Sequence, residues 1–275
     1  DGAVTFQPWT DATKLPITSG EYYLTKDVTL NSTWNFEGTN NGSTGQVRLV
    51  LCLNGHSITL SESATGNVLD IGSYATLALC DCNGSKAGLG EITGAKGNYS
   101  GVNIASKGAF AMYGGSISGN NAATTTHSAS GKGGGVYTTK SEGFTVSGNV
   151  KITGNTADDK ENNVHLGKSS WRIAVRDPLG ENARIGVTTA DEVAANSYVT
   201  IAKGEISTSS AHRYTLTAND AEHFVSDAGY TRKFNDDSVV FTNGDLHTHP
   251  ICGKTCADEK HTDKIWQGVS RLDDI

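Results

Sequence analysis

The sequence AFAMYGGSISGN at residues 109–120 decides the fold, because it returns as FTVSGNVKITGN at residues 144–155. Each copy contains a strand with alternating apolar residues, a glycine turn and a second alternating strand that ends in Gly-Asn. Phe110 and Phe144 hold the same place in the two copies and are 34 residues apart. The pattern has the period of two that is typical of strands, so it predicts a repeated β-structure.

A third short strand precedes each pair of strands. Its central apolar residues are separated by 33, 34 and 28 positions, and they are Leu69, Val102, Val136 and Val164. Three strands that recur together about every 30 residues, without a helix between them, predict the coils of a solenoid. Each strand then pairs with the matching strand of the next coil, and the inward apolar side chains stack in rows. An antiparallel sandwich with a strand every 8–12 residues is the alternative, but three strands that repeat in step favour a parallel β-helix.

Glycine contributes 33 of the 275 residues, whereas proline contributes only 4. High glycine with low proline fits short strands that are separated by tight turns. We expect Asn120 and Asn155 to lie at corners of the coils, because Asn and Gly tolerate a left-handed backbone.

The repeat divides the chain into four predicted segments. They are an N-terminal lead-in at 1–21, a parallel β-helix of about four to five turns at 22–188, a small C-terminal β-rich cap at 189–244 and a Cys/His connector at 245–275. In the cap, capping boxes predict short helices that start within 189–192 and 219–222. The strands predicted in the cap lie at 196–202, 212–217 and 238–241. Such a cap covers the open end of a solenoid, where exposed strand edges invite aggregation.

Charge and hydropathy exclude two classes of function. The net charge is −7 and the pI about 5.6, and no basic stripe is present, so a nucleic-acid partner is not expected. The longest apolar run, at 49–53, has five residues, whereas a membrane-spanning helix needs about 20. The sequence therefore predicts neither nucleic-acid binding nor a membrane-spanning helix in this fragment.

Cysteines and histidines gather near the end of the chain. Their spacing predicts a structural Zn²⁺ site with thiolate and imidazole ligands, and the ligands are His249, Cys252, Cys256 and His261. His247 is an alternative to His249. A closed site of this kind would hold a segment that has almost no core of its own. A Cys252–Cys256 disulfide and a disordered connector are the other interpretations of this spacing.

Three further cysteines, Cys52, Cys80 and Cys82, lie in the coil region. Cys52 and Cys80 are 28 residues apart, which is close to one coil. We expect these two to stack in the interior, where a free cysteine behaves as a small apolar residue.

An enzyme that hydrolyses polysaccharides requires two carboxylates across a groove. Asp70, Asn103 and His165 hold matching outward positions and predict a polar row on one face instead of a pair of acids. The acidic residues at 158–161 indicate a hydrated loop more than a Ca²⁺ site. The sequence identifies no catalytic residue, and it favours a protein that is not an enzyme without deciding the point.

Binding of sugars uses aromatic rings as stacking platforms. Four aromatic residues are candidates for ligand binding, and they are Tyr99, Tyr113, Tyr137 and Trp171. The alternative for each of them is a role in packing.

Several motifs along the chain resemble those of large surface proteins from gut Firmicutes. They lie at 22–30, 51–56, 114–120, 133–137 and 185–189, and the similarity extends over about 9–275. The resemblance implies a right-handed parallel β-helix in a secreted or surface-displayed bacterial protein. Some surface proteins of this general kind bind host immunoglobulin or glycans, so it also implies a host glycoprotein, mucin, glycan or immunoglobulin as the partner.

The end of the chain echoes its beginning. Trp9 is followed six residues later by Leu15, and Trp266 is followed six residues later by Leu272. We therefore expect a monomeric unit of a longer tandem array, which acts as a non-enzymatic adhesion module on the bacterial cell surface. A carbohydrate-active enzyme (a polysaccharide lyase or glycoside hydrolase) and a purely structural stalk are the alternatives.

Overall fold

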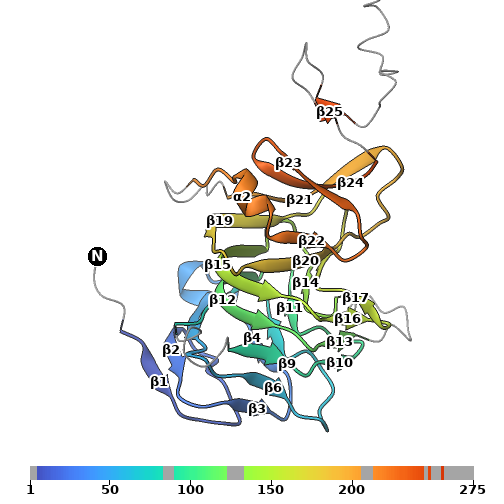
Figure 1. Cartoon of the computed structure of the whole chain (residues 1–275). Coiled ribbons are helices and arrows are strands. Elements are labelled where there is room, and N and C mark those ends of the chain that lie inside the picture. The colour runs from blue at the N-terminus through green and yellow to red at the C-terminus, as the bar shows by residue number, and fades with distance from the viewer. Residues whose placement is uncertain are drawn as a thin grey trace, which may run out of the picture.

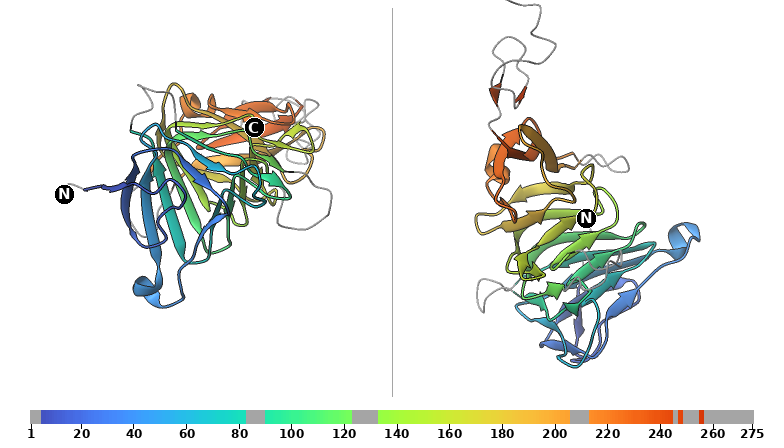
Figure 2. Two further views of the ribbon diagram at one scale, coloured as in Figure 1. Left: turned by 90° about the horizontal axis from the view of Figure 1, so that it is seen from below. Right: turned by 90° about the vertical axis from the view of Figure 1, so that its right-hand side faces the viewer.

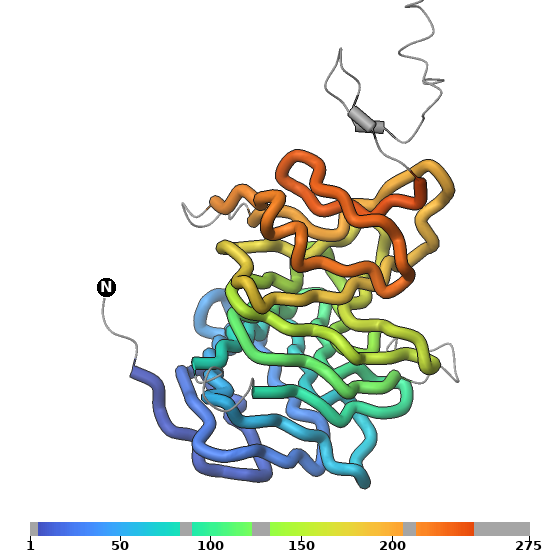
Figure 3. The backbone as a smooth tube through the Cα atoms, viewed as in Figure 1, coloured from blue at the N-terminus to red at the C-terminus, as the bar shows by residue number. Residues whose placement is uncertain are grey.

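The computed structural model describes residues 5–82, 90–122, 133–205 and 213–244, together with the backbone of residues 247–248 and 255–256. Nearly all of the regular structure is β, and most strands belong to one large sheet that coils up the molecule (Figure 1). The chain climbs coil by coil from its N-terminal end, which is clearest in the backbone tube (Figure 3). The architecture is therefore a parallel β-solenoid.

Three rows of strands run along the solenoid, and strands within a row pair in parallel. The first row contains β1 (Gln7–Trp9), β2 (Gly20–Leu24), β5 (Val47–Cys52), β8 (Ala75–Cys80), β12 (Ala109–Ile117), β15 (Phe144–Ile152), β19 (Ile173–Leu179) and β21 (Ser197–Gly204). The second contains β3 (Val28–Leu30), β6 (Ile58–Leu60), β9 (Glu91–Thr93), the ends of β12 and β15, β20 (Arg184–Thr188) and β22 (Phe224–Ser226). The third contains β4 (Trp34–Phe36), β7 (Leu69–Ile71), β11 (Val102–Ile104), β14 (Val136–Thr138), β18 (Val164–Leu166) and the end of β20.

Four short strands form a separate sheet at one corner: β10 (Lys96–Gly97), β13 (Asn121–Ala122), β16 (Thr156–Ala157) and β17 (Lys160–Glu161). A 3₁₀ turn, η1 (Gly42–Gly45), precedes β5. β25 (His247–Thr248) and β26 (Thr255–Cys256) form an antiparallel pair.

The core of the solenoid consists of the stacked inward residues. Val102 pairs in register with Leu69, Val136 pairs with Val102, and Val164 pairs with Val136. The rings of Phe110 and Phe144 stack with 5.2 Å between their centroids. These pairings confirm the stacking that the spacing of 33, 34 and 28 residues predicts. All of these residues are almost fully buried, and burial of each such side chain contributes about 1.5–3 kcal/mol to folding.

An asparagine ladder, defined as Asn120, Asn155 and Asn163, runs through one corner of the coils. Asn120 and Asn155 are 1% and 0% exposed, so they lie inside the molecule. The left-handed backbone belongs to the preceding glycines, with φ of 63° at Gly119 and 68° at Gly154. The expectation that the asparagines accommodate a left-handed backbone is therefore wrong. Their amides form hydrogen bonds from coil to coil instead.

The C-terminal region covers one end of the solenoid with antiparallel strands. β24 (Ser238–Asn243) pairs with β21 on one side and with β23 (Thr231–Asn235) on the other. The right-hand view of Figure 2 shows these strands at one end of the stack. The pairing of β20 with β22 continues the parallel row into this region, and β1 starts the first row within residues 1–21.

The predicted details of the cap are partly correct. The strands at 196–202 and 238–241 are confirmed by β21 and β24. A helix at 189–192 is wrong, because Thr189 donates to the carbonyl of Asp191 and the Asp191 carboxylate accepts from Ser169 of another coil. These bonds replace the capping interactions of a helix.

The second helix, α2 (Ala218–Ala221), has Thr217 as its N-cap, two residues before the predicted cap at Asn219. Thr217 and Asp220 form its capping box. The described part of the predicted strand at 212–217 has no ladder beyond a bridge at Arg213, because the Leu216 N–H donates to the Asp237 side chain. Among the described residues, no helix has the length and apolar character that crossing a membrane requires.

Candidate functional site

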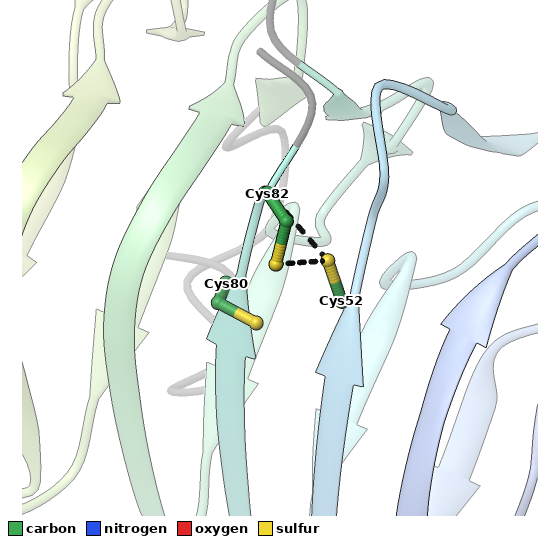
Figure 4. A group of neighbouring side chains, drawn as sticks. All are labelled: Cys52, Cys80 and Cys82. Atoms are coloured by element: carbon green, nitrogen blue, oxygen red, sulfur yellow. Dashed lines mark hydrogen bonds between the residues drawn. The ribbon is translucent and has the colours of Figure 1, made fainter. Parts of the chain in front are cut away.

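Three cysteine side chains converge where β5 and β8 end. Cys52 and Cys80 are register partners on these two strands, as their spacing predicts. Cys82 lies two residues further along, and the three sulfur atoms all lie within 4.8 Å of one another (Figure 4). The Sγ atoms of Cys52 and Cys82 are 2.9 Å apart.

The cysteine cluster, defined as Cys52, Cys80 and Cys82, lies outside the apolar core. Side chains alternate along a strand, and the inward positions beside the cluster are Leu51 and Leu79, both 0% exposed. The expectation that Cys52 and Cys80 stack is confirmed, and Cys52 is buried as expected, whereas Cys80 is only half-buried. Cys82 joins them from an exposed position. The Cys-x-Cys spacing at 80–82 was the signal for this contact, because alternate residues share a face.

Asp81 holds the loop that carries two of these thiols. Its carboxylate accepts hydrogen bonds from the N–H of Gly55 at 2.7 Å and the N–H of Gly90 at 2.6 Å. Asn54 and Gly55 form a left-handed turn after β5, with φ of 53° and 79°. The carboxylate therefore fastens the end of one coil to the corner of the coil before it, and it is occupied by backbone donors.

Hydrogen bonds among the three thiols favour the negatively charged form of Cys52. The hydrogen bond from Cys80 lowers the pKa of the Cys52 thiol to about 5, and bonds from the side chain and N–H of Cys82 act in the same direction against burial. The hydrogen bond with Cys52 and burial raise the pKa of both Cys80 and Cys82. These hydrogen bonds therefore favour the charged form of Cys52 over the charged forms of Cys80 and Cys82. Thiolate sulfur is the preferred ligand of soft metal ions.

A second feature is a hollow of about 470 Å³ on the lateral surface, after β18. Its lining consists of His165, Gly167, Lys168, Ser169, Ser170, Ala190 and Asp191. Ser169 Oγ donates to Asp191 Oδ2 at 2.5 Å across two successive coils. The hollow offers an ammonium group, hydroxyl groups, an imidazole and a carboxylate within one small volume.

Two of the predicted aromatic residues contact this lining. The rings of Tyr137 and His165 lie 5.8 Å apart on paired strands, and Tyr137 is 8% exposed. Lys168 Nζ lies 5.4 Å from the ring centroid of Trp171, which is half-buried. Tyr137 and Trp171 thus flank the hollow through His165 and Lys168.

The other two aromatic residues lie elsewhere on the solenoid. Tyr99 follows β10 in a loop, and its side chain is 36% exposed. Tyr113 lies within β12, close enough to Arg176 for the guanidinium to offset part of the rise in its pKa that burial causes. Neither residue lines the hollow.

The predicted polar row is present on the third row of strands. Asp70 pairs in register with Asn103, and Asn103 Nδ2 donates to Asp70 Oδ1 at 2.8 Å. The row continues through Tyr137 and His165 to Thr188. Tyr137 follows Val136 as Asp70 follows Leu69, so the spacing of the third row already places it in this row.

The zinc site predicted in the connector involves His249, Cys252, Cys256 and His261, whose side chains lie outside the described residues. The backbone of Cys256 pairs with that of His247 in the β25–β26 pair. The zinc site and its two alternatives therefore stay predictions. No protein-family model, no curated protein and no solved structure matches the chain.

Proposed function

We propose that the chain is a non-enzymatic binding module on a right-handed parallel β-helix, and that it binds a glycan of a host glycoprotein in the lateral hollow. The observation that carries this proposal is the meeting of five polar side chains with two flanking aromatic rings. The polar lining consists of His165, Lys168, Ser169, Ser170 and Asp191, and Tyr137 and Trp171 pack against it.

The chemistry of the hollow suits a sugar. Sugar hydroxyls both donate and accept hydrogen bonds, so they match a lining that offers the Lys168 ammonium as a donor and the Asp191 carboxylate as an acceptor. The volume of about 470 Å³ lies within the range of small-molecule sites, which is about 300–1,000 Å³. The exposed part of Trp171 supplies an apolar ring beside these groups, as stacking of a sugar requires.

Binding without cleavage is favoured by the acid content of the hollow. Asp191 is the one carboxylate among its described lining residues, and this carboxylate accepts from Ser169. Hydrolysis of a glycosidic bond uses two carboxyl groups about 5–10 Å apart. The carbohydrate-active enzyme remains the second candidate, because the solenoid places this hollow on a long open face.

A secreted module of a bacterial surface protein would use such a site in many copies. Each coil stacks on the last, so a tandem array of these units would present hollows at regular intervals. Linked sites raise avidity by orders of magnitude without a new contact. Weak affinity at one hollow is therefore compatible with adhesion to mucin or to glycosylated immunoglobulin.

The test is direct binding of the chain to immobilised mucin glycans and to immunoglobulin before and after enzymatic removal of its glycans. We expect binding to free glycans and loss of binding after deglycosylation. Asp191→Asn and Trp171→Ala should each weaken binding by about tenfold or more, because each removes one charge-assisted or stacking contact. Tyr99→Ala is the matched aromatic control and should leave affinity unchanged.

The same assay separates the alternatives. Release of new reducing ends or unsaturated sugars, abolished by substitution of one acid, would replace the binding module by the enzyme. Equal binding of immunoglobulin with and without glycans would overturn the glycan assignment. No binding to any of these ligands would leave the structural stalk as the function.

A further inference from the structure

The cysteine cluster takes no part in the lateral hollow. Its strands, β5 and β8, belong to the first row, whereas the hollow follows β18 in the third row. None of its three residues lines the hollow, and the proposed glycan binding makes no use of them. The cluster therefore requires its own explanation.

The distances between the sulfur atoms fit a single metal ion. A tetrahedral ion with zinc–sulfur bonds of about 2.3 Å holds its thiolates about 3.8 Å apart. All three sulfur atoms already lie within 4.8 Å of one another, so movements of an ångström or less bring them to that spacing. The shortest pair, Cys52 and Cys82 at 2.9 Å, would separate, and it is far from the 2.05 Å of a disulfide.

The surroundings hold the three sulfur atoms in place. Cys52 and Cys80 lie on directly paired strands, so their separation is fixed by the ladder. The Asp81 carboxylate fixes the loop between Cys80 and Cys82 through two backbone N–H groups. The N–H of Cys82 also donates to Cys52 Sγ at 3.3 Å, which is the kind of hydrogen bond that supports a thiolate ligand.

Access to the cluster comes from one side. Cys52 is 2% exposed, Cys80 is half-buried and Cys82 is exposed, so the sulfur atoms form a graded approach from solvent. A cysteine that only fills apolar space would have apolar neighbours on all sides. Cys52 and Cys80 instead lie on the outward side of their strands. Three ligands with an open side leave one coordination position for water.

We propose that Cys52, Cys80 and Cys82 bind one soft metal ion, of the class of Zn²⁺, Cd²⁺ and Cu⁺, through three thiolates with the fourth position open to solvent. Binding forms three metal–sulfur bonds, and the thiols release their protons to water as they bind. No oxidant is required, in contrast to disulfide formation. The ion would fasten β5 to β8 and to the loop that begins at Asp81, and so stiffen this corner of the solenoid.

The experiment must separate this site from the site predicted in the connector. The full chain with Cys252→Ser and Cys256→Ser removes both connector thiols and leaves the three thiols of the cluster. This variant is reduced, freed of metal and titrated with Cd²⁺, whose bond to thiolate gives an ultraviolet charge-transfer band. We expect the band to saturate at about one equivalent. The addition of Cys82→Ser should remove most of the band, and this exposed position makes loss of folding a minor concern.

Two further measurements keep the result decisive. Circular dichroism of the Cys82→Ser variant verifies folding, and Cys80→Ala provides a second test if that variant does not fold. In the variant as purified, before reduction, an intact mass lower by two hydrogen atoms, with one free thiol in place of three, would overturn the proposal in favour of a disulfide within the cluster. Three free thiols without a cadmium band, or a band that a weak chelator abolishes, would overturn it in favour of simple free cysteines. Failure here leaves the glycan proposal untouched, because the two sites share no residue.

Discussion

The asparagine ladder and the cysteine cluster both connect neighbouring coils through polar side chains, but only the ladder is saturated. Asn155 Nδ2 donates to the carbonyl of Ile117 at 2.8 Å and to Asn163 Oδ1 at 3.0 Å. Its Oδ1 accepts from the amide of Asn120 at 2.9 Å. At the end of the ladder, the carboxylate of Asp227 accepts from both the side chain and the backbone N–H of Asn163 at 2.8 Å.

The cysteine cluster contrasts with this closed network. Its sulfur atoms are weak hydrogen-bond partners, and Cys82 faces solvent. A saturated network has no remaining capacity for a ligand, so its contribution is structural. The three thiols keep that capacity, so they can bind a ligand from solvent. Identical residues stacked in a solenoid can therefore stabilise the fold or bind a ligand. They stabilise the fold where their polar groups already have partners, and they can bind a ligand where these groups have only weak ones.

The largest effect is expected from breaking the ladder. Asn155→Leu removes an amide that is 0% exposed and leaves the Ile117 carbonyl and the Asn163 side chain without this partner. Each buried group left unpaired costs about 1–3 kcal/mol, so the free energy of unfolding should fall by about 4 kcal/mol. Denaturant unfolding measures the change. Asn121→Ala, at an exposed position of β13, is the control and should change stability by less than about 0.5 kcal/mol.

A smaller change than about 1 kcal/mol for Asn155→Leu would show that water replaces the amide, and the ladder would then no longer be the saturated member of the comparison. The corresponding substitution in the cysteine cluster, Cys82→Ser, should change the free energy of unfolding only slightly, because the thiols form few strong hydrogen bonds.

A second saturated network lies in the cap, and it is expected to respond to pH. Asp220 is 1% exposed, and its carboxylate accepts from the N–H of Leu179, from Thr217 and from the hydroxyl of Tyr214. Burial alone would raise the pKa of Asp220, but these hydrogen bonds outweigh it and lower the pKa below 3.8. Asp220→Asn should therefore cost about 2 kcal/mol at neutral pH, since an amide cannot accept all these bonds.

The sign of the pH dependence follows from the lowered pKa. The unfolded chain binds a proton near pH 3.8, whereas folded Asp220 binds it only at lower pH. The stability that the carboxylate provides is thus complete above that value and is lost as the pH falls through the folded pKa. The difference in Tm between the wild type and Asp220→Asn should shrink below pH 4. Asp236→Asn, at an exposed turn, is the control, and a difference that is constant with pH would contradict the assignment.

The repeat pattern explains why the coils could be predicted from the sequence. Inward residues such as Val102 and Val136 are interchangeable in kind, so their spacing alone reveals the register. The polar corners could not be predicted in the same way. A Gly-Asn pair does not show which residue takes the left-handed backbone, and Asn155 acquires its role only from partners that are 35 residues before and 8 residues after it.

The candidate sites depend on contacts between coils that spacing does not encode. Ser169 and Asp191 are separated by 22 residues and meet because the chain turns between β20 and β21. The same contact also holds Asp191 away from the helix that the capping box at 189–192 predicts. Cys82 follows β8 and lies outside the one-coil spacing of Cys52 and Cys80, so the local Cys-x-Cys spacing is the one sequence signal for its place in the cluster.

The smallest effect is expected from Cys82→Ser in metal-free buffer, because the exposed sulfur makes little apolar contact and a hydroxyl keeps a donor at the same place. The free energy of unfolding should change by less than about 0.5 kcal/mol, measured in the Cys252→Ser, Cys256→Ser background. Zinc should then reveal the difference between saturated and unsaturated stacks. At a free Zn²⁺ concentration of 100 times the dissociation constant, the parent should gain about 2.7 kcal/mol and the Cys82→Ser variant much less. Asn155→Leu should lose the same stability with and without zinc, because the ladder has no place for the ion; a zinc-dependent loss there would mean that the two stacks act as one unit.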